Sequence, residues 1–152
     1  MPITPMPPMT DESVLAGHRL FLENACNKCH GKFGRGGSME KVEVGTDTWG
    51  NKAAAADLSS GMFRGGDRPI DIYRRIYSGI NGTPMPAFEK LFKDNPDAIW
   101  QLVHFIKSTG NRRRQGKLPL SEADMPAEAP SSDKPEESSV PETESEPAAV
   151  AA

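Results

Sequence analysis

The stretch Cys26-Asn27-Lys28-Cys29-His30 holds both cysteines of this 152-residue chain and one of its three histidines. Two thiols three positions apart in a short turn can each bond to one vinyl group of the same porphyrin. The imidazole that follows them is then aimed at the iron. The motif therefore predicts one covalently attached haem c, with thioether bonds from Cys26 and Cys29 and with His30 as an axial iron ligand.

Three other uses of the two cysteines compete with this interpretation. A thioredoxin-like dithiol requires a preceding strand and a βαβ context, and the sequence shows neither. A zinc site requires further ligands at short spacing, and the other two histidines are the distant His18 and His104. A disulfide between Cys26 and Cys29 would be strained and would close too small a loop to stabilise the fold much. Haem attachment is the use that the motif favours.

A helical pattern precedes the motif and a glycine-rich loop follows it. Thr10 is a good N-cap, and apolar residues then recur at helical spacing up to the Cys26 turn. The segment 31–66 is rich in glycine and lacks proline, and only Ala53–Ala56 suggests a short helical turn. Such a long loop is unusual in a compact domain unless it wraps around something, and a haem meets that need.

Two more helices are predicted in the second half of the chain. One begins at Pro69 and stops at Gly79. The other begins at Asn95 and ends at Gly110. Their apolar faces comprise Ile70, Tyr73, Ile76, Tyr77 and Ile80, then Ile99, Trp100, Val103, Phe105 and Ile106. The expected fold is a small all-α domain of three main helices around one haem, with long glycine-rich loops.

The second axial ligand is expected from the segment Gly82-Thr83-Pro84-Met85-Pro86. The prolines fix the backbone on both sides of Met85 and restrict the residue before each of them. Met85 is thus presented from a stiff, extended loop that has little freedom to lose on binding iron. The simpler interpretation, that Met85 packs in a core, is outweighed by the haem motif.

Three other residues compete for the iron. Met39 and Met62 lie in looser, glycine-rich sequence. His104 would give a chemically reasonable bis-histidine iron. It stands in the middle of the last predicted helix, where a hydrogen bond near the surface is the simpler role.

Composition divides the chain into three parts. Residues 1–9 are a proline-rich extension or linker, and residues 10–117 carry the domain. Residues 118–152 have nine acidic residues, one basic residue and six prolines, so they are expected to stay disordered unless a partner binds them. The body 1–117 has 17 basic and 12 acidic residues, a net charge of +5, against −8 for the tail.

Several classes of protein are excluded by composition. No run of 18 apolar residues could span a membrane, and the first residues do not form a signal peptide. The basic cluster Arg112–Arg114 fits a solvated helix end better than a nucleic-acid surface.

Thioether attachment of haem takes place on the outer side of a membrane. We therefore expect an extracytoplasmic protein, in the bacterial periplasm, whose export signal has been removed.

Together these segments resemble a class I cytochrome c domain over residues 11–110. The resemblance implies haem c on Cys26 and Cys29, with His30 and Met85 as axial ligands. It also implies that the first and last helices cross closely at Gly17. Phe21 would there meet an aromatic side chain, for which Phe105 is the candidate. The segments that carry the likeness are Gly17–Phe21, Cys26–Gly31, Tyr73–Ile76, Gly82–Pro86 and Trp100–Ile106.

This chain departs from the family in one respect. Many members carry a proline about ten residues after the axial histidine, and its carbonyl orients the imidazole. No proline lies between Pro8 and Pro69 here, so the group that accepts the His30 Nδ1 proton stays open. Candidate contacts to the haem propionates are Arg64, Trp49 and Tyr73.

The resemblance suggests electron transfer rather than an enzyme. The chain would be a soluble carrier or the cytochrome subunit of a respiratory or dehydrogenase complex. A mildly basic rim around the two ligand loops would dock on an acidic patch of a redox partner. The alternative is a haem enzyme or a haem-based gas or redox sensor in which Met85 is displaced. The rim comprises Lys28, Lys32, Arg35, Lys90 and Lys93.

Overall fold

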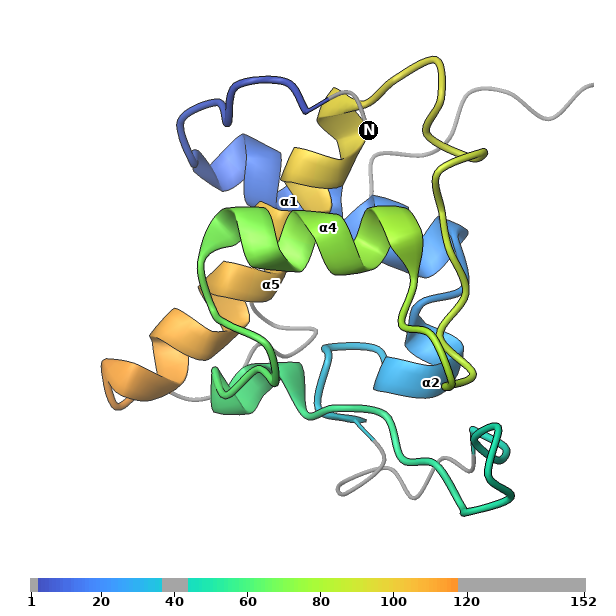
Figure 1. The fold of residues 1–152 in the computed structure, drawn as a ribbon. Coiled ribbons are helices and arrows are strands. Elements are labelled where there is room, and N and C mark those ends of the chain that lie inside the picture. Colours follow the sequence, from blue (N-terminus) through green and yellow to red (C-terminus); the bar gives the residue numbers. More distant parts are fainter. Residues whose placement is uncertain (1–2, 37–43, 118–152) are drawn as a thin grey trace, which may run out of the picture.

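The helices form where capping residues and apolar periodicity coincide in the sequence. The computed structural model describes residues 3–36 and 44–117, so the predicted acidic tail lies outside the described residues. Within these ranges the one β-type pairing is the isolated contact of Thr46 with Lys52. The all-α prediction is confirmed. The elements in chain order are α1 (Asp11–Glu23), α2 (Asn27–His30), the 3-10 helix η1 (Leu58–Ser60), α4 (Pro69–Ser78) and α5 (Asp97–Arg114) (Figure 1).

Helix α1 begins at the predicted cap. The Thr10 side chain accepts the Ser13 amide proton at 3.2 Å, and the Ser13 hydroxyl oxygen accepts the Thr10 amide proton at 2.9 Å. Asp11 and Glu12 place negative charge in the first turn, where it suits the helix dipole. The helix ends at Glu23, two residues before Ala25, which has the unusual φ of +58°. That left-handed residue turns the chain into the cysteine motif.

The closest helix packing is the crossing of α1 and α5. A methyl group at Gly17 would lie 1.9 Å from the Gln101 carbonyl oxygen, so only glycine allows the two backbones to approach. The ring of Phe21 lies 5.0 Å from the ring of Phe105, centroid to centroid, and both are buried. The predicted crossing and its aromatic pair are confirmed.

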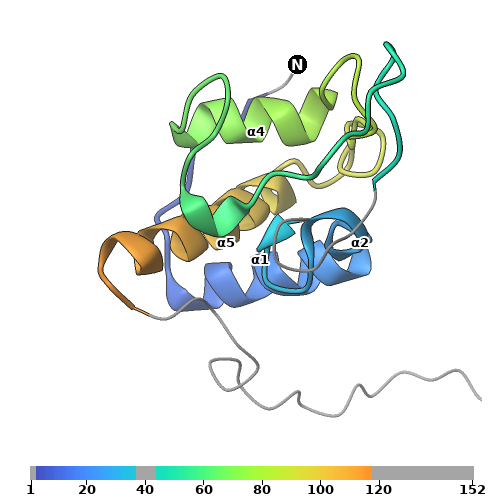
Figure 2. The same ribbon diagram turned by 90° about the horizontal axis from the view of Figure 1, so that it is seen from below.

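Helix α4 packs on the other side of α5, as the two views show (Figures 1 and 2). Pro69 occupies the first turn and Gly79 caps the end, as the sequence predicts. Tyr73 is fully buried, with its ring centroid 4.5 Å from that of Trp100. In the first turn Arg68 pairs with Asp71 through two hydrogen bonds of 2.8 and 3.0 Å. The pair lowers the pKa of the Asp71 carboxyl, chiefly through those bonds.

Two local predictions are wrong. Helix α5 does not end at Gly110 but continues to Arg114, because Gly110 serves packing: a methyl group there would lie 3.0 Å from the Gly61 Cα. The segment Ala53–Ala56 forms no helical turn. It passes beside Gly36, where a methyl group would lie 2.8 Å from the Ala56 carbonyl.

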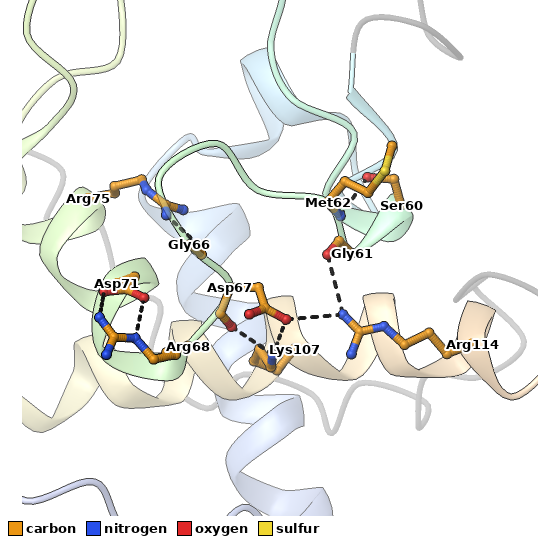
Figure 3. A network of polar contacts seen from close by, with 10 residues as sticks. All are labelled: Ser60, Gly61, Met62, Gly66, Asp67, Arg68, Asp71, Arg75, Lys107 and Arg114. Carbon is orange, nitrogen blue, oxygen red and sulfur yellow. Dashed lines mark hydrogen bonds and ion pairs between the residues drawn. The ribbon is translucent and has the colours of Figure 1, made fainter.

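A polar network ties the loop before α4 to the C-terminal half of α5 (Figure 3). The Lys107 ammonium donates to the Asp67 carbonyl at 2.8 Å and lies 3.8 Å from the Asp67 carboxylate. Arg114 bridges that carboxylate, at 3.5 Å, and the Gly61 carbonyl, at 3.3 Å. These contacts therefore hold the loop between η1 and α4 against α5.

The first described residues lie against the start of α5. The Trp100 indole N–H donates to the Thr4 carbonyl and hydroxyl oxygens at 3.1 and 3.0 Å, and the Thr4 hydroxyl donates to Asp97 at 2.7 Å. The linker predicted for residues 1–9 is thus attached to the domain at Thr4. None of the described helices is both long and apolar enough to span a lipid bilayer.

Candidate haem-binding site

The cysteine motif lies on a tight turn that directly follows α1. The Cys26 amide donates to the Phe21 carbonyl at 3.0 Å, and the His30 amide donates to the Cys26 carbonyl at 3.0 Å. Gly31, with a φ of +73°, then turns the chain away. Both thiols are half-buried and free, and they belong to one turn. The two thiols are therefore arranged so that both could bond covalently to one planar group such as a porphyrin.

The turn also orients His30. Its Nδ1 lies 3.1 Å from the Ala56 carbonyl oxygen. A carbonyl can only accept, so Nδ1 carries the proton and Nε2 keeps its lone pair for a metal. Burial lowers the pKa of the imidazole, although the bond to Ala56 acts in the opposite direction. The ring is therefore held neutral and oriented, and Ala56 is the acceptor that the sequence left open.

Backbone contacts place Ala56 at this position. The Ala53 amide donates to the Gly45 carbonyl at 2.9 Å, and the Leu58 amide donates to the Gly34 carbonyl at 2.7 Å. These two bonds fix the segment on either side of Ala56. The sequence does not reveal this acceptor, because a residue of any type can supply a backbone carbonyl.

The chemistry of Cys26 argues against the competing uses of the motif. Burial raises the pKa of its thiol to about 11, which is opposite to the shift that activates a reactive dithiol. Within residues 3–36 and 44–117, no three His, Cys, Asp or Glu side chains group so as to hold a metal ion. The described part of the chain thus favours neither a thioredoxin-like pair nor a zinc site.

Met85 lies on a loop that returns to the end of α4. The Ile80 amide donates to the Met85 carbonyl at 3.2 Å, and the Thr83 hydroxyl oxygen accepts the Met85 amide proton at 3.3 Å. A methyl group at Gly79 would lie 2.8 Å from the Met85 carbonyl oxygen, so glycine is needed where the helix meets the loop. Met85 is half-buried. This loop and α2 lie at the same end of the molecule, away from the C-terminal end of α5 (Figures 1 and 2).

Two of the three competing candidates for the iron are placed elsewhere by the structure. Met62 is 80% exposed, and Met39 lies outside the described residues. His104 lies in the α1–α5 interface, where its Nδ1 is 2.9 Å from the Ser13 hydroxyl oxygen at the far end of α1 from the cysteines. The expected hydrogen bond of His104 is present and part-buried, but the ring itself is buried, because α1 covers that face of α5.

The three candidate propionate contacts occupy very different positions. Arg64 is exposed on the loop between η1 and α4. Trp49 is 77% exposed and lies against Gly82 of the Met85 loop. Tyr73 is enclosed in the α4–α5 core beside Trp100. Arg64 and Trp49 are thus exposed on loops, whereas Tyr73 is buried between two helices.

Four lysines of the predicted basic rim are exposed, and Arg35 is half-buried. Lys32 also has a second role, since its carbonyl accepts a proton from the buried His18 Nε2 at 3.0 Å and its ammonium lies 5.7 Å from the Phe33 ring centroid. The exposed lysines are Lys28, Lys32, Lys90 and Lys93.

The residues fit a covalently bound haem. Two free thiols share one turn, a neutral imidazole is oriented with Nε2 available, and a methionine stands on a closed loop at the same end of the fold. Thiols, imidazole and thioether are the donor set of a c-type centre with one histidine and one methionine ligand.

The comparisons with known proteins agree with this donor set. The chain matches the family model described as Cytochrome c over residues 14–110. No curated protein matches it. Among solved structures it is similar, with 34% identity and a TM-score of 0.64, to a chain of the reducing HAO-like protein complex of Kuenenia stuttgartiensis. The likeness covers 72% of this chain and 49% of the other, so this chain spans about half the length of that relative.

Proposed function

Because the chain belongs to the cytochrome c family, we propose that it carries single electrons between redox partners on one haem c. The observation that carries the proposal is the way in which hydrogen bonds hold two side chains that could bind iron. The Ala56 carbonyl fixes His30, and the closed loop that ends α4 offers Met85. Two such ligands leave no open position on the iron for a substrate, which favours a carrier over an enzyme.

When bound, the haem supplies an iron that alternates between the ferrous and ferric states. The protein contributes position and surroundings. Cys26 and Cys29 hold the ring, and the Nδ1–H bond of His30 keeps that imidazole from rotating. A thioether ligand favours the ferrous state, so we expect a positive reduction potential that Met85 tunes most.

Optical spectra of the native protein, matured with its haem, test this proposal. We expect the reduced form to show c-type haem bands, and the oxidised form to show the weak band of methionine-to-iron ligation. The reduced form should leave added CO unbound. Rapid CO binding by the unaltered protein would instead indicate an enzyme or a sensor with a labile sixth ligand.

A place in a larger assembly is a second candidate role. The likeness to a chain of a reducing HAO-like protein complex favours a fixed electron-transfer subunit over a free carrier. If the chain is such a subunit, it should co-purify with a second redox protein from its native source. Isolation as a lone protein at physiological salt would favour the free carrier.

The partner and the compartment follow from the same chemistry. The exposed lysines near the ligand loops suit a redox partner with an acidic docking surface. Partner reduction should then slow as ionic strength rises, because salt screens exposed charges. Because thioether attachment of haem takes place on the outer side of a membrane, we propose that the mature protein lies in the periplasm of a bacterium, which fractionation of cells would test.

A further inference from the structure

A small turn next to the Met85 loop has unusually complete internal bonding. Asp47 Oδ1 accepts the amide protons of Trp49 at 2.9 Å and Asn51 at 2.8 Å, and Oδ2 accepts from the Asn51 side chain at 3.2 Å. The backbone closes the same turn, since the Asp47 amide donates to the Asn51 carbonyl at 2.9 Å. These bonds, that of the Asn51 amide first, lower the pKa of the Asp47 carboxyl, so it stays an ionised acceptor.

The turn is fastened to the loop that carries Met85. The Thr48 amide donates to the Gly82 carbonyl at 3.0 Å. Gly82 has a φ of +80°, and a methyl group there would lie 3.1 Å from the Trp49 ring and 3.3 Å from the Thr48 hydroxyl oxygen. The Trp49 ring thus rests on the one residue of the loop that has no side chain, three positions before Met85.

This contact explains the placement of Trp49. The side chain is 77% exposed, so burial of its ring contributes little to the core. Asp47 fixes the Trp49 backbone, and the Trp49 ring contacts the Met85 loop at Gly82, which has no side chain. The Met85 loop itself is mostly exposed at residues 80–86, so it needs support from outside.

We propose that the turn formed by residues 45–52 is a clasp that holds Met85 in position as an iron ligand. Asp47, Thr48 and Trp49 are then positioning residues: they act on the iron through Gly82 and the Met85 loop. The inference rests on the proposed function, because it takes Met85 to be the axial ligand. Its consequence is that the ease of displacing Met85 depends on residues 36 to 38 positions earlier in the chain.

Cyanide binding to the oxidised protein tests the clasp, since cyanide must displace the sixth ligand. Asp47→Ala removes three hydrogen bonds that hold the turn and should raise the apparent cyanide affinity about tenfold or more. Asp47→Asn keeps an oxygen for both backbone amides and should restore most of the original affinity. The methionine-to-iron band should weaken in Asp47→Ala alone, and the Thr48 amide should exchange with solvent faster.

A matched pair of glycine variants separates the clasp from backbone strain. Gly82→Ala adds a methyl group against Trp49, whereas Gly116→Ala has a similar φ of +68° and meets nothing within 4 Å. Gly82→Ala should raise cyanide affinity, Gly116→Ala should not, and adding Trp49→Ala to Gly82→Ala should relieve part of the effect.

The two ideas fail in different ways. A methionine-to-iron band that is absent from the unaltered protein overturns Met85 ligation and the clasp together. A band that is present in the unaltered protein and unchanged in Asp47→Ala and Gly82→Ala, with unchanged cyanide affinity, overturns the clasp alone.

Discussion

At Gly17 an added methyl group would meet a main-chain carbonyl at 1.9 Å, whereas at Gly82 it would meet the exposed ring of Trp49 at 3.1 Å. The first contact lies inside the packed crossing of α1 and α5. The second joins two loops beside Met85, the proposed iron ligand. The helical side, which is the crossing of α1 and α5, is held by buried apolar area. The loop side, which comprises residues 45–52 and the Met85 loop, is held by backbone hydrogen bonds and, in the functional protein, by the haem. Stability and ligand chemistry should therefore respond to different residues.

Met85→Ala should have the largest effect, and on the loop side alone. Removing the thioether leaves an open position on the iron, so the reduced protein should change from inert to full CO binding. Met62→Ala is the control, because Met62 is 80% exposed and lies outside the Met85 loop. CO titration of both variants checks this. A Met85→Ala protein that still excludes CO would mean that another residue binds the iron.

Phe105→Ala should act mainly on the helical side. Its ring lies 5.0 Å from that of Phe21 and 4.9 Å from that of His18, and all three are buried. Deleting the ring leaves a cavity, so the free energy of unfolding should fall by about 3–5 kcal/mol. Urea unfolding of the haem-loaded protein measures this. The methionine-to-iron band should persist, and its loss under native conditions would show that the two sides are coupled.

Gly17→Ala tests the helix crossing more gently. Alanine is the better helix former by about 1 kcal/mol, but here its methyl group would force α1 and α5 apart. Overpacking of this kind costs about 1–3 kcal/mol, so we expect net destabilisation in urea. If the variant does not mature, Phe105→Leu offers a milder change at the same crossing. An unchanged or raised stability for Gly17→Ala would show that the backbones are not in contact.

A fall in pH should have the smallest effect on the helical side, and it should lower the free energy of unfolding. Burial lowers the pKa of His18 and of His104 below their ordinary 6.5. The folded state thus holds both rings neutral while the unfolded chain takes up protons. Their contribution to stability is complete above about pH 6.5 and is lost as the pH falls through the lowered values.

A single variant isolates one of these rings. His104→Gln cannot gain that proton, so the free energy of unfolding of this variant should fall less than that of the unaltered protein between pH 7.5 and 5.5. Urea unfolding at several pH values makes the comparison. Parallel curves for the two proteins would show that His104 does not titrate on unfolding.

How far the sequence predicts the structure also differs between the two sides. Thr10, Pro69 and Gly79 mark helix ends through their own side chains or lack of one, so these boundaries could be predicted. Gly110 carries the same local signal as Gly79, yet it lies inside α5 because Gly61 packs on it. Whether a glycine ends a helix or lets another segment pack against the helix depends on a tertiary contact, and the local sequence does not show that contact.

The site divides in the same way. Cys26, Cys29 and His30 form a motif whose spacing alone indicates haem attachment, and the prolines around Met85 mark a stiff loop. The Ala56 carbonyl and the contact of Trp49 with Gly82 join segments about 26 and 33 positions apart, and carry no residue-type signal of their own. The Asp47-Thr48-Trp49-Gly50-Asn51 sequence does indicate a turn, but not which loop it meets.

Intact-mass measurement of the native, matured protein is the most direct test of the central claim that both cysteines hold one haem. We expect the chain mass plus that of a single haem, retained under denaturing conditions, with Cys26 and Cys29 unreactive toward a thiol reagent. Free thiols at both positions and a mass equal to that of the polypeptide alone would contradict the account.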